Sequence, residues 1–335
     1  LVNCIHMLYS MIQLKNGGRI TMKILVLGSI NIDYNYYVGH ITTPKETQGA
    51  SHMEVFPGGK GLNQAVTLAR AGLEVQLAGQ IGSDGQEMLD KLKEQLCIDI
   101  SPVRVVEGRT GHAIIQVDEI GQNAIMIYGG ANRTIDEAYI DDVLAQYGEG
   151  DVLVLQNEIS GLQYAIDAAY EKKMFIVLNP SPCTRELLRS DLTKISMFCL
   201  NEIEGRSMTS YVQPGDILIR LAEMYPNSQF LFTLGSQGAF YKNGTRQIYQ
   251  ASLKVPVVDS TAAGDVFEGY FLAAYLYGKD AEVALKYATY ASALSVTKRG
   301  AAYFSAPTMD KVEEYMMNPK HRPDFNPAPP VLENA

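Results

Sequence analysis

The sequence predicts an α/β fold in which a central, mainly parallel sheet is flanked by helices on both faces and carries a small β-sheet lid. Short apolar runs typical of buried strands alternate with segments of helical periodicity, which is the pattern of a parallel sheet covered on both sides. Two regions interrupt this alternation and suit a separate small sheet. The 335 residues, 47% of them hydrophobic, suffice for a large core.

The alternation begins with a strand at residues 23–28. A helix follows at 62–71, where apolar residues recur at helical spacing before Gly72 ends it. A long helix at 280–297 closes the series, and we assign residues 22–317 to one α/β domain. Between these segments, strand-like and helical stretches follow one another at 75–79, 85–96, 152–155, 161–171, 175–179, 198–201, 214–224 and 230–234.

Two regions lie outside the alternation. Residues 34–55 are polar, lack helical periodicity and contain Pro44. Residues 110–128 are typical of two strands around a turn-forming cluster at 118–123. Excursions at these points predict a lid over the edge of the main sheet at which open α/β sheets bind ligands.

The two ends differ in composition from the rest. Residues 1–14 are moderately apolar but lack the cationic start and the cleavage site of a signal peptide, so we interpret residues 1–21 as a non-native or disordered extension. Residues 318–335 are rich in proline and polar residues, which predicts a flexible tail.

Charge and cysteine spacing exclude several classes of function. A net charge of -9 without a run of Lys or Arg argues against nucleic acid as a partner. No stretch reaches the ~18 apolar residues that a membrane helix requires. The cysteines lack Cys-x-x-Cys spacing and a nearby His, so we expect reduced thiols in a cytoplasmic protein and no zinc site; they are Cys4, Cys97, Cys183 and Cys199.

A turn of small residues lies within 258–267, Val-Asp-Ser-Thr-Ala-Ala-Gly-Asp-Val-Phe, where we expect a strand to end and a helix to begin. The backbone N–H groups of Ala262, Ala263 and Gly264 would face outward, and the helix start adds partial positive charge, so the turn suits a phosphate. Asp265 would place a base within reach of the attacking group. An ordinary helix start with Asp in its first turn stays open as the alternative.

A second glycine-rich segment, Phe-Pro-Gly-Gly-Lys-Gly-Leu-Asn-Gln-Ala at 56–65, also leads into a helix. It has no Walker A register, because no hydroxyl residue follows Lys60. With Gly-Ser-Ile-Asn-Ile-Asp at 28–33, these segments resemble the ribokinase, or PfkB, family of carbohydrate kinases over residues 23–310. Leu-Asn-Pro-Ser-Pro at 178–182 and the Ala-Ala-Gly-Asp turn are most similar to the ribose-phosphorylating members.

Three positions depart from the commonest family pattern. Ser260 stands where Thr is usual, Glu268 stands where Asn is frequent, and Tyr303 with Phe304 lengthens a loop. None of them removes a catalytic group. The lengthened loop bears on a monovalent-cation site that the resemblance implies at Asp259, Thr261, Val296, Arg299, Ala301 and Ser305.

The resemblance also assigns the other roles. It makes Asp265 the general base and gives the anion hole to residues 262–264. It implies sugar binding by Asn31, Asp33, Gly59, Lys60, Asn63, Glu158 and Asp265. It implies nucleotide binding by Asn201, Glu204, Thr233, Gly235, Ser236, Gly238 and Gly264. Glu204 would organise Mg²⁺ through water. Singly, each residue has a structural alternative; Asn201, for example, would cap a helix.

The sequence therefore predicts an ATP-dependent kinase that converts a small sugar, D-ribose, to its 5-phosphate. The resemblance implies Mg²⁺ as the cofactor, K⁺ as a candidate activator, and a homodimer that forms through the lid. One alternative is a kinase of the same fold acting on deoxyribose, a ketohexose or a nucleoside. Another is a non-catalytic sugar-binding regulator, against which the intact Asp265 argues. A nicotinamide dehydrogenase is disfavoured because no Gly-x-Gly-x-x-Gly follows the first strand.

Overall fold

The main sheet of the chain contains nine strands among the residues that the structure, a computed structural model, describes: 22–96, 98–318 and 324–327. Their order is β15-β14-β13-β12-β11-β10-β1-β4-β6. Pairing is parallel from β13 to β6, and the β14–β15 hairpin is antiparallel. The predicted mainly parallel sheet is thereby confirmed. The bounds are β1 (Ile24–Leu27), β4 (Val75–Ala78), β6 (Ile98–Asp99), β10 (Val152–Gln156), β11 (Phe175–Asn179), β12 (Met197–Asn201), β13 (Gln229–Thr233), β14 (Ala239–Asn243) and β15 (Arg246–Gln250).

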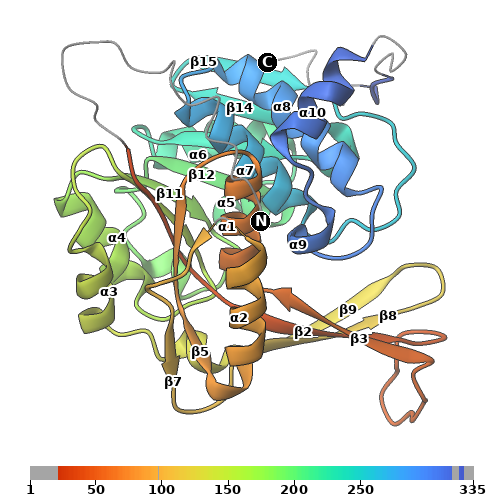
Figure 1. The fold of residues 1–335 in the computed structure, drawn as a ribbon. Helices are drawn as coiled ribbons and strands as arrows, with labels where there is room; N and C mark the ends of the chain where they lie inside the picture. Colours follow the sequence, from red (N-terminus) through yellow and green to blue (C-terminus); the bar gives the residue numbers. More distant parts are fainter. Residues whose placement is uncertain (1–21, 97, 319–323, 328–335) are drawn as a thin grey trace.

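Helices cover both faces of this sheet (Figure 1). Successive side chains of β1 enter two separate cores, since neighbours on a strand point to opposite faces. Ile24 and Val26 pack with the first set of helices, and Leu25 and Leu27 pack with the second. The first set comprises α1 (Lys60–Arg70), α2 (Gln86–Gln95), α7 (Ala263–Leu276), α8 (Ala281–Ser295), α9 (Ala302–Ser305) and α10 (Met309–Met317). The second comprises α3 (Glu137–Leu144), α4 (Leu162–Glu171), α5 (Glu202–Thr209) and α6 (Pro214–Met224).

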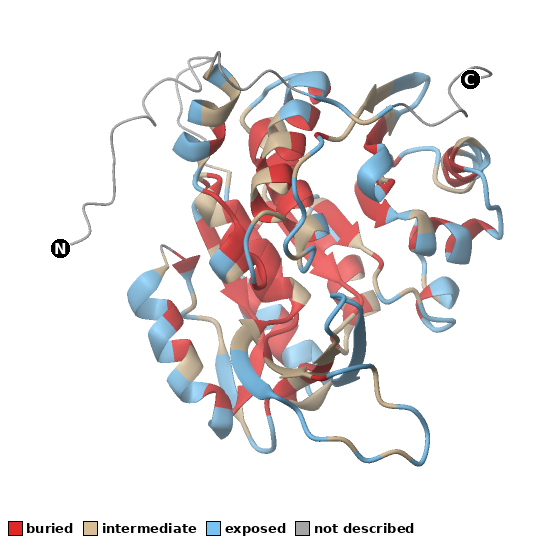
Figure 2. Cartoon of the chain, turned by 90° about the vertical axis from the view of Figure 1, so that its right-hand side faces the viewer, coloured by how far each residue is buried: buried red, intermediate tan, exposed pale blue. Residues whose placement is uncertain are grey.

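A separate small sheet has the order β3-β2-β8-β9 and extends away from the helices at the lower right of Figure 1. It arises from the two regions that interrupt the alternation, as the sequence predicts. Its strands are β2 (Asn31–Tyr37), β3 (His52–Gly58), β8 (Gly111–Val117) and β9 (Asn123–Tyr128). Figure 2 shows the buried main sheet in contrast to the exposed and intermediate residues of the small sheet, of which β3 and β9 are the most exposed strands. A further parallel pair joins β5 (Gln80–Gly82) to β7 (Arg104–Val106).

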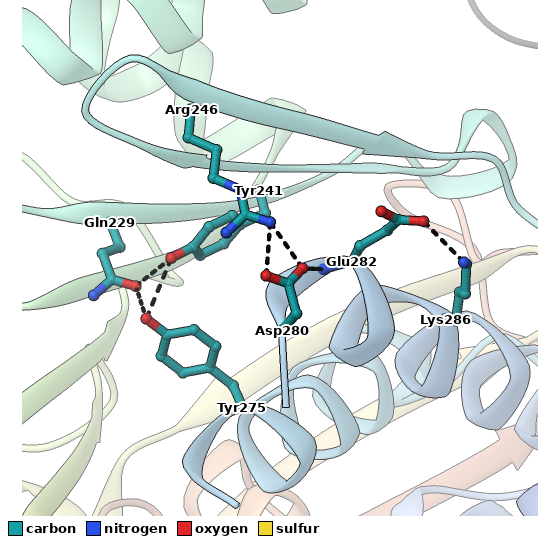
Figure 3. A network of polar contacts seen from close by, with 7 residues as sticks. All are labelled: Gln229, Tyr241, Arg246, Tyr275, Asp280, Glu282 and Lys286. Carbon is teal, nitrogen blue, oxygen red and sulfur yellow. Dashed lines mark hydrogen bonds and ion pairs between the residues drawn. The ribbon is translucent and has the colours of Figure 1, made fainter. Parts of the chain in front are cut away.

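A polar network fixes α7 and α8 against the antiparallel hairpin (Figure 3). Gln229 Oε1 accepts hydrogen bonds from the hydroxyls of Tyr241 and Tyr275 at 2.7 and 2.9 Å. Arg246 donates to both carboxylate oxygens of Asp280, each at 2.8 Å, and Asp280 also caps α8. These contacts hold the C-terminal end of α7, so that its N-terminal end is presented at the opposite edge of the sheet.

The strand expected just before residue 262 is not formed. Residues 254–260 are irregular, because Pro256 interrupts the run and the N–H groups of Val258 and Asp259 both donate to the carbonyl of Val296. The described part of the predicted tail, residues 324–327, is tied to the fold. The Asn326 N–H donates to Ser252 O at 2.9 Å, and Lys254 N–H donates to Asp324 O at 2.8 Å.

Some expectations lie outside the described residues, among them the extension at 1–21 and two of the cysteines, Cys4 and Cys97. Cys183 and Cys199 are free thiols, and Cys199 is buried. Over the described ranges, no helix combines the length and the apolar character needed to cross a membrane.

Candidate active site

Polar side chains gather where parallel strands of the main sheet end. Ser29 follows β1, Glu158 follows β10, and Asn179, Asn201 and Thr233 end β11, β12 and β13. The carboxyl ends of parallel strands meet at one edge of a sheet, and α1 and α7 both begin at this edge. The two turns that the sequence singled out are therefore neighbours, although about two hundred residues separate them.

The turn at residues 58–61 brings α1 into direct contact with the end of β1. The Leu62 N–H donates to Ser29 O at 3.0 Å. A Cβ added to Gly61 would lie 2.6 Å from the carbonyl carbon of Gly28. Gly59 adopts a φ of 91°, a backbone conformation that favours glycine. The glycines of this turn are thus required for packing.

Asp265 lies buried at the start of α7 and faces α1. Its carboxylate accepts hydrogen bonds from Asn63 Nδ2 at 3.4 Å and from Gln64 Nε2 at 3.3 Å. Burial raises the pKa of Asp265, while the nearby Lys60 ammonium and the two amides act in the opposite direction. The predicted base and the predicted sugar-binding Asn63 therefore occupy one site.

A second group of predicted sugar-binding residues lies where β2 leaves β1. Glu158 accepts hydrogen bonds from the Ser29 hydroxyl and from the Lys60 N–H. Burial, together with the charge of Glu158, raises the pKa of Asp33 to about 7. Asn31 is buried and accepts a hydrogen bond from Asn132 Nδ2 at 2.8 Å. Glu158 connects this group to the first, because its charge acts on the pKa of both Lys60 and Asp265.

Lys60 links the two groups through its charge. Burial lowers the pKa of Lys60, but several carboxylates outweigh that effect and raise it, so the ammonium is retained. Asp265 contributes most, followed by Glu158 and Glu204, and the Glu268 carboxyl contributes least. The charge of Lys60 thus acts on Glu158 and on Asp265, which belong to the two groups of predicted site residues.

The turn of small residues borders a cavity of about 210 Å³. Ala262 has a φ of 58°, an uncommon conformation for a residue with a Cβ, and it sets the direction in which α7 begins. The Ala263 N–H donates to Ser260 O at 3.1 Å, so this amide is engaged within the turn. Ala262 and Gly264 lie at the helix start, where N–H groups lack intrahelical acceptors. The cavity also contacts Lys60, Asn179, Cys199, Asn201, Glu204, Thr233, Asp265 and Glu268.

Asn201 and Glu204 border this cavity and also cap α5. The Asn201 side chain accepts from the N–H groups of Ile203 and Glu204, and the Glu204 carboxylate accepts from the Asn201 N–H at 2.8 Å. Asn201 therefore caps a helix, which is the structural alternative that its sequence position allowed. The cap also fixes the Glu204 carboxylate at the cavity wall.

A larger cavity of about 440 Å³ adjoins the first, and the two share Thr233, Ser260, Ala263 and Gly264. Three further residues predicted to bind nucleotide border it, namely Gly235, Ser236 and Gly238. Asn326 borders it as well, and its side chain donates to Ser252 Oγ at 2.8 Å. The C-terminal segment therefore forms part of this wall, which its composition did not predict.

The loops expected to hold a monovalent cation lie beside the turn of small residues. The Asp259 carboxylate connects the two loops, because it accepts hydrogen bonds from the Thr261 N–H in one loop and from the Gly300 N–H in the other, each at 2.9 Å. The expected ligands are a carboxylate, carbonyls and a hydroxyl, which suit a hard cation. Among the described residues, no group of three or more His, Cys, Asp or Glu side chains could hold a metal ion by itself.

The lengthened loop after Ala301 forms the short helix α9. Ser305 is buried, and its hydroxyl donates to Ala301 O at 3.1 Å, so these two predicted ligands lie together. Phe304 packs edge-on against Phe56 of β3, with ring centroids 5.2 Å apart. The additional residue pair therefore contacts the small sheet beside the glycine-rich turn.

Four polar residues of the site were missed by the sequence analysis as functional candidates: Gln64, Asn132, Gln156 and Glu268. Gln64 stands next to Asn63 in a motif that was recognised, which was the available signal. Glu268 was noted as a departure from the family pattern. Asn132 and Gln156 gave no signal, because their partners lie far away in the sequence.

The chain matches the model of the pfkB family of carbohydrate kinases over residues 21–309. It is 33% identical over 301 residues to a ribokinase of Haemophilus influenzae, covering 87% of this chain and 97% of that protein. It is 30% identical over 304 residues to a deoxyribokinase of Salmonella typhi, covering 88% and 99%.

Solved structures of ribokinases also resemble the chain. The ribokinase of Thermotoga maritima superposes with a TM-score of 0.79 at 33% identity, covering 89% of this chain and 100% of that one. The Arabidopsis thaliana ribokinase complexed with ribose and ATP gives a TM-score of 0.77 at 27% identity, covering 89% and 100%. The architecture described above is thus that of the ribokinase-like fold.

Proposed function

The chain belongs to the pfkB family of carbohydrate kinases, and on that basis we propose that it transfers the γ-phosphoryl group of ATP to the primary hydroxyl of D-ribose. The product would be D-ribose 5-phosphate. Both the ribokinase relatives and the structure complexed with ribose and ATP support this substrate pair. One observation carries the proposal: Asp265 stands between Asn63, on the sugar side, and the cavity bordered by residues 262–264.

Asp265 would act as the general base. It would accept the proton of the sugar hydroxyl while that oxygen forms a bond to the γ-phosphorus. The bond from the γ-phosphorus to the bridging oxygen would break, and ADP would leave with that electron pair. The Lys60 ammonium would keep Asp265 ionised before the reaction, because it opposes the effect of burial on this pKa.

The turn of small residues would stabilise the charge that spreads over the phosphoryl oxygens. Open N–H groups at the start of α7 suit this role, because they are fixed before the reaction and lie where the helix dipole is positive. Ala262 carries only a methyl group and Gly264 has no side chain, so neither residue presents a bulky group to the phosphate. A phosphoryl group placed there would lie on the same helix turn as Asp265.

Two metal ions belong to the proposal. Mg²⁺ bound to ATP would lie near Glu204, through water, and it would neutralise phosphate charge when bound. K⁺ would be held by the loops that contain Asp259, Thr261, Val296, Arg299, Ala301 and Ser305. Asp259 already joins these loops, so a cation there would stiffen the turn at 262–264.

A substrate panel tests the proposal. ADP release would be measured at fixed ATP with ribose, 2-deoxyribose, fructose and adenosine, and we expect ribose to give the highest kcat/KM. A highest value with adenosine or fructose would move the protein to another substrate class. Sugar binding without ADP release would make it a sugar-binding regulator.

Deoxyribose is a second candidate substrate, because the deoxyribokinase of Salmonella typhi is nearly as similar to the chain as the ribokinases are. A site that hydrogen-bonds the 2-hydroxyl penalises its absence, since buried polar groups then lose their partner. A ribose preference above about tenfold in kcat/KM would indicate such contacts. Equal kcat/KM values for ribose and 2-deoxyribose would make both sugars substrates of this enzyme.

We also propose that the small sheet pairs two subunits. Its strands β3 and β9 expose Met53, Val55 and Met126, which the strand register places on one face of the small sheet. Sedimentation of Val55→Asp should show a monomer, whereas the matched Val212→Asp, at another exposed valine, should stay dimeric. A wild-type protein that sediments as a monomer at all concentrations would contradict this assignment.

A further inference from the structure

Glu268 is a buried carboxyl that the reaction described above does not use. It lies about one helical turn after Asp265 on α7 and borders the same cavity as the turn of small residues. Gln64 Nε2 donates to Glu268 Oε2 at 3.1 Å and to Asp265 Oδ1 at 3.3 Å. One amide group therefore joins this carboxyl to the proposed base.

The orientation of that amide is fixed from its other end. Gln156 Nε2 donates to Gln64 Oε1 at 2.5 Å, so the Gln64 N–H groups must point toward α7. Asn179 Nδ2 also donates to Glu268 Oε2, at 3.0 Å. Oε2 thus accepts two hydrogen bonds, whereas Oε1 has no hydrogen-bond partner in the described part of the chain. A buried carboxylate needs donors at both oxygens, so this pattern leaves the ionised form incompletely stabilised, whereas Oε2 can serve as the carbonyl oxygen of the neutral acid.

Burial favours the neutral state. Asp265 on α7, Lys60 on α1 and the Cys199 thiol on β12 face Glu268. Burial raises the pKa of Glu268 to about 8, and the charge of Asp265 adds to this, while the Asn179 amide, the Lys60 ammonium and the Cys199 thiol oppose it. Lys60 already faces the carboxylates of Asp265, Glu158 and Glu204. Ionised Glu268 would add another buried negative charge beside a site that must accept a phosphate.

We propose that Glu268, as a neutral carboxylic acid, is a positioning residue for the base: it holds the Gln64 amide against Asp265 and leaves Asp265 to carry the negative charge beside the turn of small residues. The inference rests on the proposed role of Asp265. Ionisation of Glu268 would place a second negative charge next to the γ-phosphoryl group and next to Asp265. Turnover should therefore fall in the alkaline range, as Glu268 loses its proton.

The first test compares the pH dependence of kcat for wild type and Glu268→Gln, at saturating ATP and sugar. Glutamine keeps an oxygen that accepts from Gln64 and Asn179, but it cannot ionise. We expect Glu268→Gln to stay within about threefold of wild type at neutral pH and to lose the alkaline decline. Glu268→Ala, which removes the contact with Gln64, should lower kcat about tenfold or more while the KM for sugar changes little.

Two outcomes of this test would overturn the inference. In one, wild type and Glu268→Gln have the same pH profile up to about pH 9.5, well above the pKa of Glu268. In the other, Glu268→Gln loses as much activity as Glu268→Ala, which would mean that the ionised carboxylate is required. A loss in the alanine variant that the glutamine variant rescues is the result expected of a neutral positioning group.

A second test needs no substrate and so separates this inference from the proposed function. The pKa of Glu268 is about 8 in the folded chain, above the ordinary 4.5. Between these two pH values the unfolded chain loses the Glu268 proton while the folded chain keeps it, so the free energy of unfolding falls as pH rises. Wild type should therefore lose stability between about pH 5 and pH 8 relative to Glu268→Gln. The urea midpoint of Glu268→Gln minus that of wild type should increase over this pH range and then stay constant.

A constant difference in urea midpoint would show that Glu268 is ionised in the folded protein and would overturn the inference. A widening difference, combined with no turnover on any substrate of the panel, would support a neutral Glu268 and contradict the kinase role. The two failures are thus distinguishable.

Discussion

The two turns of the candidate active site both contain small residues and both lead into a helix, but they differ in their surroundings. At residues 58–61, a Cβ on Gly61 would lie within 2.8 Å of backbone atoms of Gly28 and Ser29. At the other turn, a Cβ on Gly264 would meet nothing within 4 Å. The first turn is filled by the protein itself, and the second opens into the cavities.

This difference indicates what each turn does. Gly59 and Gly61 allow α1 to approach the end of β1, and that approach places Lys60, Asn63 and Gln64 at Asp265. Small residues at 262–264 instead leave space beside N–H groups at a helix start, where a ligand is needed to complete the contacts. The first turn therefore positions side chains, and the second is available to a phosphate.

The largest effect is expected from Asp265→Asn. Loss of the base should reduce kcat by about 10³-fold or more, while sugar binding changes little, because asparagine can still hydrogen-bond a hydroxyl. Steady-state kinetics and calorimetry of ribose binding would measure the two quantities. Near wild-type turnover in this variant would remove Asp265 from the base role.

Gly61→Ala should lower the stability of the folded chain. Because the added methyl would meet backbone atoms of Gly28 that cannot move away, we expect a loss of about 1–3 kcal/mol in the free energy of unfolding. Urea denaturation measures this loss. An unchanged stability would mean that the first turn has the same open space as the second.

Gly264→Ala should leave stability unchanged and lower kcat/KM for ATP by about 10- to 100-fold, because the methyl occupies space beside the proposed phosphate site. Gly148→Ala is the matched control, since a Cβ there also meets nothing within 4 Å. Equal kinetics for both variants would argue against a phosphate at this turn.

Asn326→Ala should have the smallest effect. Its side chain holds the C-terminal segment to Ser252 at the wall of the larger cavity. Loss of this contact should raise the KM for ATP about two- to fivefold and leave the KM for sugar unchanged. A parallel change in both KM values would separate the C-terminal segment from nucleotide binding.

The sequence predicted the sheet, its covering helices and the separate small sheet, because each depends on local apolar patterns. It also placed Asn63 and Asp265 in one site, through motifs that belong to a known family. The prediction of a strand before residue 262 was wrong, because Pro256 and the hydrogen bonds from Val258 and Asp259 to the Val296 carbonyl keep this backbone irregular. Helices α3, α5, α9 and α10 and the β14–β15 hairpin were not predicted.

The role of Glu268 could not be read from the sequence, because its partners come from separate elements. Gln64 lies on α1, Asn179 ends β11 and Cys199 lies within β12, and only the folded chain brings them together. A departure from a family pattern indicates that a position is unusual. The chemistry of that position follows from neighbours that are distant in sequence.

The most direct test of the account is an experimental structure of the chain with ribose and a non-hydrolysable ATP analogue. The account predicts that the primary hydroxyl lies about 3 Å from the Asp265 carboxylate, with the γ-phosphate against the N–H groups at the start of α7. A sugar bound away from Asn63 and Asp265, or a γ-phosphate away from residues 262–264, would contradict it.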